Sequence, residues 1–113
     1  MEHINVLERL IENRTKQLAT NPTERLLEET MDILCVLDLD DEAMVKALIL
    51  LKRANPSYFV NTAPHLISFQ KIVRRLGGYI MANSDKIEAL KSKSYEEIMS
   101  SLTKHNSRIG ENK

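Results

Sequence analysis

The hydropathy of this chain repeats with the period of an α-helix and nowhere with the period of a β-strand. Apolar residues recur at spacings of three and four, and β-branched residues do not cluster between turn signals. The sequence therefore predicts an all-α fold, a compact bundle of about five helices. The predicted helices cover residues 4–19, 22–37, 41–54, 63–76 and 85–103.

The core of this bundle is expected to be aliphatic, because the chain has two Phe, three Tyr and no Trp. Segment 41–54 has so few polar positions that we expect it to be the central helix, covered on more than one side. In the other segments, the expected core stripes are Leu7, Leu10, Ile11 and Leu18; Leu27, Met31, Leu34 and Leu37; Leu66, Ile67, Phe69, Ile72, Val73 and Leu76; and Ile87, Leu90, Ile98 and Leu102.

Two stretches fix the predicted ends of the second and fourth helices. Asn21 is expected to cap the second helix, with Pro22 in its first turn and Glu24 reaching back to the cap. Gly77 and Gly78 are expected to end the fourth helix through a left-handed C-cap. The connection that follows is then predicted to be a loop.

Further breaks are predicted on either side of the fourth helix. Pro56 lies in the interruption before it, where residues 57–61 could make one short turn. Ser84 is expected to cap the last helix. Ser94 and Glu97 form the pattern of a second capping box, which predicts a break or kink near residue 93.

Charge is distributed unevenly along the chain, although the formal net charge of the 113 residues is zero. Residues 1–44 hold 4 Lys or Arg against 11 Asp or Glu, and residues 45–113 hold 12 against 5. This polarity suits docking to charged segments of other proteins, or neutralisation of one half by the other within the bundle. A basic face of Lys71, Arg74 and Arg75 is a small patch for binding nucleic acid.

The chain offers little material for catalysis or metal binding, so we expect no enzyme, no cofactor and no metal site. Its histidines have no second ligand at helical spacing. A calcium loop starting at Asp38 would need Gly where Ala43 stands and Glu where Ile49 stands. The single cysteine, Cys35, is expected to be a buried thiol, which fits a reducing compartment. The sequence has no apolar run long enough for a membrane span. We therefore expect a soluble, intracellular protein.

Two stretches carry a resemblance to a known family. In "LDLDDEAMVKAL" Leu39 is isolated among aspartates and followed by Asp40, and "HLISFQKIVRRLGGY" holds Lys71, Arg74 and Arg75. They resemble two interhelical loops of the integrase-binding domain of the lens-epithelium-derived growth factor and its hepatoma-derived growth factor-related relatives. Leu76 stands where the family has an aromatic residue. The resemblance covers about residues 23–104.

The resemblance implies a right-handed helical bundle similar to the N-terminal domain of the elongation factor TFIIS. Residues 1–20 then form an additional N-terminal helix, residues 21–104 the bundle and residues 105–113 a disordered tail. The additional helix could pack on the bundle, pair with a second copy in a homodimer, or cover the binding site.

For function, the resemblance implies a nuclear interaction module that docks disordered acidic Phe-containing segments of transcription or chromatin proteins and tethers them to chromatin. Leu39 and Leu76 would form an apolar slot for the aromatic anchor. Asp40 would accept hydrogen bonds from the partner's amides, and Lys71, Arg74 and Arg75 would attract its acidic residues. The alternatives are another TFIIS-like elongation adaptor or a nucleic-acid-binding domain. For Leu39, the alternative is a core position beside an aspartate that caps a helix.

Overall fold

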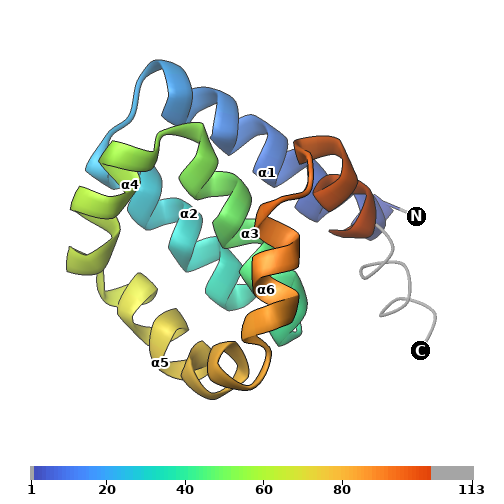
Figure 1. Ribbon diagram of the computed structural model, residues 1–113. Helices are drawn as coiled ribbons and strands as arrows, with labels where there is room; N and C mark the ends of the chain where they lie inside the picture. Colours follow the sequence, from blue (N-terminus) through green and yellow to red (C-terminus); the bar gives the residue numbers. More distant parts are fainter. Residues whose placement is uncertain (1, 103–113) are drawn as a thin grey trace.

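Helix α3 (Asp41–Ala54) runs through the centre of the computed structural model, and the other helices pack around it (Figure 1). The structure describes residues 2–102, with side chains from residue 6 onward. Residues 95–102 form a last helical segment, and no strand occurs between residues 2 and 102, which confirms the all-α prediction. The other elements are α1 (Glu2–Thr20), α2 (Glu24–Val36), α4 (Pro56–Thr62), the 3-10 helix η1 (Ala63–His65), α5 (Ile67–Ala82) and α6 (Ser84–Lys91).

The central position of α3 follows from its composition. Every residue from Ala43 to Ala47 is buried, as are Leu50 and Leu51 further along the helix. An α-helix can bury such consecutive positions only when neighbours cover it on several sides. The prediction of a central third helix is therefore confirmed.

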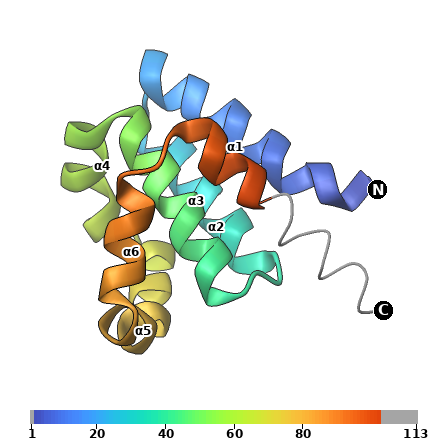
Figure 2. The ribbon, with the colours of Figure 1, turned by 45° about the vertical axis from the view of Figure 1, so that its right-hand side comes forward.

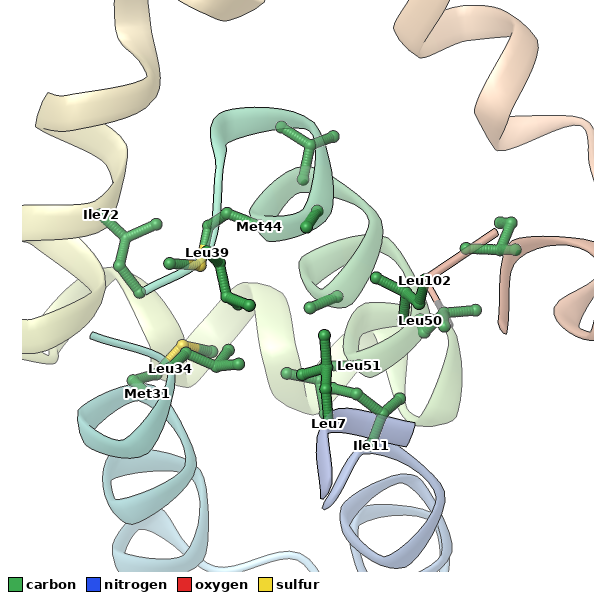
Figure 3. Packing of buried hydrophobic residues seen from close by; sticks show 14 of the residues in the cluster. Leu7, Ile11, Met31, Leu34, Leu39, Met44, Leu50, Leu51, Ile72 and Leu102 are labelled. Carbon is green, nitrogen blue, oxygen red and sulfur yellow. The ribbon is translucent and has the colours of Figure 1, made fainter. Parts of the chain in front are cut away.

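Helix α1 is part of the core. Leu7, Ile11 and Leu18 are buried, and Leu7 and Ile11 point toward Leu51 of α3 (Figure 3). The additional N-terminal helix was expected to pack on the bundle, pair with a second copy or cover the binding site; in the structure it packs on the bundle. The predicted tail of residues 105–113 lies outside the described residues.

Helix α2 begins two residues later than predicted. Its N-cap is Thr23, whose hydroxyl accepts a hydrogen bond from the Leu26 amide at 3.0 Å. Asn21 and Pro22 lie before the helix, so the prediction that Asn21 caps it is wrong. Thr at an N-cap satisfies one of the free amides of the first turn in the same way as Asn.

Residues Pro56–Thr62 form a complete helix, α4, where only a short turn was expected. Pro56 occupies the first turn, where its missing amide costs nothing, and the Asn55 side chain accepts from the Tyr58 amide at 3.4 Å. Pro56, which was expected to interrupt the chain, thus starts a helix. Phe59 of α4 is buried against the core.

Helix α5 continues through Gly77 and Gly78 to Ala82, so the predicted end of this helix is wrong. Neither glycine has a positive φ, and the left-handed cap is therefore absent. The chain turns instead at Asn83, and Ser84 is the first residue of α6 rather than its cap. Buried Ile72 and Leu76 hold α5 on the core before the glycines, and half-buried Tyr79 packs against it after them.

A break after α6 is confirmed. Residues 92–94 are not helical, and the helix resumes at residue 95. The capping box is reciprocal, since the Ser94 amide donates to Glu97 Oε1 at 2.9 Å and the Glu97 amide donates to Ser94 Oγ at 3.1 Å. Ile98 and Leu102 of this last segment are buried in the core, as predicted.

Candidate functional site

An open apolar groove lies between α3, α5 and α6. Its hollow has a volume of about 280 Å³. Phe59 of α4 also lines it and makes an edge-to-face contact with Phe69, with ring centroids 5.6 Å apart. The lining side chains are Val45, Leu48, Ile49 and Lys52 of α3, Phe69, Leu76 and Ile80 of α5, Ile87 and Lys91 of α6, and Phe59.

The groove exists because α5 buries only part of its apolar surface. Ile72 and Leu76 are 2% and 0% exposed, whereas Ile80 is 40% exposed and Phe69 is half-buried. In both views of the ribbon, α5 lies at the far side of α3 from α1 (Figure 1, Figure 2). The inner side of α5 thus faces an incompletely filled space beside α3 and α6.

Two polar connections hold α6 against α3 and so fix one wall of the groove. Lys86 of α6 pairs with Glu42 of α3 at 3.1 Å. At the other end, Nη2 of Arg53 donates to the carbonyl oxygen of Lys91 at 2.7 Å, which satisfies a free carbonyl in the last turn of α6. The ion pair and the hydrogen bond from Arg53 together hold α6 so that Ile87 and Lys91 line the groove.

The rim of the groove is basic. Lys52 is exposed and has no ion-pair partner in residues 6–102, and Lys91 pairs only with exposed Glu88, at 3.3 Å. A second hollow of about 410 Å³ shares Phe69 with the groove and is lined by Arg74, Val73, Gln70 and Pro64. Apolar surface is therefore flanked by cations at both hollows.

Glu42, one turn before the groove residue Val45 on α3, is already neutralised. Glu42 binds both Lys86 and buried Lys46, each at 3.1 Å. Burial alone would raise the pKa of Glu42, but hydrogen bonds from Lys86 and Lys46 overcome this effect and lower its pKa to about 2. Glu42 is thus ionised at all physiological pH values, and its charge is compensated within the fold.

Leu39 and Leu76 lie in the core, so the apolar slot predicted between them is not open at the surface. Leu39 is 5% exposed, and in Figure 3 it points among Met44, Leu34 and Ile72. Leu76 is completely buried. For Leu39 the structure shows the alternative arrangement, an inward leucine beside a capping aspartate. The reason is that the transfer of an aliphatic side chain from water into the core is favourable.

The polar residues predicted for the site either make contacts within the fold or are exposed on α5. Asp40 is exposed and caps α3, since its Oδ1 accepts from the Ala43 amide at 2.8 Å. Arg75 binds Asp41 and the backbone of Leu39 within the chain. Lys71 and Arg74 are exposed on the outer side of α5. These residues do not enclose one pocket.

Two further predictions concern reactive side chains. Cys35 was expected to be buried and is exposed; its thiol donates a hydrogen bond to the Ser68 carbonyl oxygen at 3.8 Å. Its place on the outer face of α2, one residue from the core stripe, explains the difference. Within residues 2–102 no three His, Cys, Asp or Glu side chains are grouped to hold a metal ion.

Sequence reasoning missed the groove because it ended the fourth helix at the glycines. Ile80 then belonged to a loop, and its place seven residues after Val73 on the same helical face went unnoticed. The period of three and four continues through 69, 73, 76 and 80, and this signal was present in the sequence.

Comparisons with protein-family models, with curated proteins and with solved structures found no match to this chain. In the part of the chain that the structure describes, no helix is long and apolar enough to cross a lipid bilayer.

Proposed function

We propose that this protein is a protein–protein interaction module whose groove docks short acidic segments that carry large apolar side chains. The observation that supports this proposal is the apolar groove between α3, α5 and α6 with Lys52 and Lys91 at its rim. An apolar hollow supplies an anchor point from which water is displaced, and cations around it steer an acidic partner and fix its orientation.

The volume of the groove limits what it can hold. About 280 Å³ is at the small end of ligand pockets, and it suits one or two large side chains of a longer segment. The second hollow beside Val73 and Arg74 extends the same contact along α5. A peptide segment uses both hollows, whereas a compact small molecule fills only one.

The resemblance to the integrase-binding domain supports the class of partner. That family binds disordered acidic Phe-containing segments of transcription and chromatin proteins, and we extend this partner class, a nuclear location and a TFIIS N-terminal-like bundle to this chain. Because Leu39 and Leu76 are buried, the site we propose is the groove rather than the slot between the two loops.

A nuclear magnetic resonance titration of the ¹⁵N-labelled chain tests this proposal. The probe is a synthetic acidic peptide with two Phe residues, and the control peptide has every Glu and Asp replaced by Lys. We expect amide shifts at Leu48, Ile49, Phe69 and Ile80 with the acidic peptide alone. Equal binding of both peptides, or no shifts at millimolar peptide, would remove the proposal.

A matched pair of substitutions separates the groove from the remaining surface. Ile80 is 40% exposed in the groove, and Val6 is 48% exposed on α1, at the opposite side of α3. Ile80→Glu places a carboxylate in the groove and is expected to lower the affinity for the acidic peptide at least about tenfold. Val6→Glu adds the same charge elsewhere and is expected to leave the affinity within about twofold.

A further inference from the structure

We infer that the segment docked in the groove is an amphipathic α-helix whose backbone passes closest to α5 at Gly77. This inference rests on the proposed function and adds the conformation and the orientation of the partner. It is carried by a glycine that the fold itself does not require and by the apolar residues around it.

Nothing in the described chain explains glycine at position 77. Its φ is not positive, and a Cβ built there meets no atom within 4 Å. Glycine inside a helix costs about 1 kcal/mol relative to alanine. The chain therefore keeps a bare patch of helix surface in the second half of α5, at a cost in stability and with no benefit to its own packing.

Gly77 is half-buried and lies between exposed apolar residues of α5. Val73, Gly77, Ile80 and Met81, here called the α5 stripe, follow one another at the spacing i, i+4, i+7 and i+8, which is one face of a helix. Val73, Ile80 and Met81 are 44%, 40% and 83% exposed. Ile80 lines the groove and Val73 lines the second hollow, so Gly77 lies on α5 between the residues that the two hollows share with the stripe.

A helix suits this surface better than an extended segment. The walls of the groove are helices, whose amides and carbonyls bond within the helix, so an extended peptide would find few partners for its own backbone there. A helical segment satisfies its backbone internally. Two helices pack with axes 8–10 Å apart, and a glycine at the contact allows the shorter distance.

The length and the charge of the surface also agree with a helix from another, acidic protein. Val73 to Met81 spans about 12 Å along α5, which corresponds to about two turns of a docked helix. Lys52 and Lys91 lie on the groove side, and Lys71 and Arg74 lie on α5 itself. A second copy of α5 would bring like charges together at this face, whereas a helix with flanking Glu residues complements them.

Two alanine substitutions give the test. The probe is a designed helical peptide of 16 residues with Leu or Phe at i, i+4, i+7 and i+8 and Glu on both flanks. Gly78 is the matched control, because a Cβ there is equally unobstructed and the residue lies about 100° further around α5. We expect Gly77→Ala and Gly78→Ala to raise the melting temperature alike, since alanine is the better helix former.

Binding is expected to separate the two variants. Gly77→Ala should lower the affinity for the peptide at least about fivefold, because the added methyl group holds the two helix backbones apart. Gly78→Ala should leave its affinity unchanged. In the complex, ¹³Cα shifts of the labelled peptide should be helical, and a peptide of the same composition with a central Pro should bind more weakly.

Each contrary result has a distinct meaning. Equal affinities of Gly77→Ala and the unchanged chain, or a bound peptide without helical ¹³Cα shifts, would overturn the helical mode while shifts in the groove still uphold the proposed function. No groove shifts with any acidic peptide would overturn both. Sedimentation showing a dimer that Gly77→Ala but not Gly78→Ala dissociates would assign the surface to a second copy and overturn the acidic partner.

Discussion

Arg75 donates a hydrogen bond from Nη2 to the carbonyl oxygen of Leu39 at a distance of 2.5 Å. The same side chain reaches Asp41, with 3.1 Å between Nε and Oδ1. These contacts tie α5 to the loop between α2 and α3 and to the first residue of α3. The two stretches that were expected to receive a partner thus bind each other, and Arg75 acts as a brace within the fold.

Replacing Arg75 should therefore reduce stability. We expect Arg75→Ala to lower the free energy of unfolding by about 1 kcal/mol, because a charged hydrogen bond to a backbone carbonyl is lost and the partly exposed ion pair adds little. Urea denaturation measures the change. Arg74→Ala is the control, since Arg74 is exposed and makes no hydrogen bond or ion pair within residues 6–102. Equal stability of both variants would contradict the brace.

Leu39→Ala should destabilise the protein by about 2–4 kcal/mol, because it removes a buried side chain and leaves a cavity beside Met44 and Ile72. The midpoint of denaturation should fall accordingly. Val36→Ala, at a side chain that is 83% exposed and three residues away, should change stability by less than about 0.5 kcal/mol. A Leu39→Ala variant as stable as the unchanged chain would place this leucine outside the core.

Asp40 is expected to act through its cap. Asp40→Ala should cost about 1 kcal/mol, because the Ala43 amide loses its acceptor, whereas Asp40→Asn should cost only a few tenths, because Asn caps equally well. Thermal unfolding of the two variants compares them. If Asn proved as damaging as Ala, the negative charge of Asp40 rather than its cap would be the important property.

Stability should depend on Glu42 at acid pH. The pKa of Glu42 falls from 4.5 to about 2 in the folded chain, since the hydrogen bonds from Lys86 and Lys46 outweigh the effect of burial. A carboxylate with a lowered pKa stabilises the fold above its unfolded pKa and loses that effect as the pH falls through the folded value. We expect a loss of up to about 3 kcal/mol between about pH 5 and pH 2.

The control for this pH dependence is a second lysine-paired glutamate. Glu42→Gln should lower stability at pH 7 and flatten the acid limb of the profile. Glu88→Gln should leave both unchanged, because the side chain of Glu88 is 72% exposed in its pair with Lys91. Parallel urea titrations from pH 2 to pH 7 compare the three chains; an unchanged acid limb in Glu42→Gln would assign the pH dependence to other carboxylates.

Local sequence patterns were most informative where only one structure fits them. The spacing of Leu27, Met31 and Leu34 makes a helix with one buried face, and all three are buried. The capping box of Ser94 and Glu97 consists of two hydrogen bonds between these two residues and does not depend on the rest of the fold. Where two local solutions exist, the prediction was wrong, as at Asn21 and Thr23.

The helical period of the apolar residues determined by itself that this chain is all-α, that α3 is central and where most core residues lie. The same period continues past Gly77 to Ile80, but only the tertiary structure decided that Leu39 turns inward and that a groove remains between α3, α5 and α6. The physical reason is that a residue's local preference is about 1 kcal/mol or less, while packing a side chain into the core contributes several times as much.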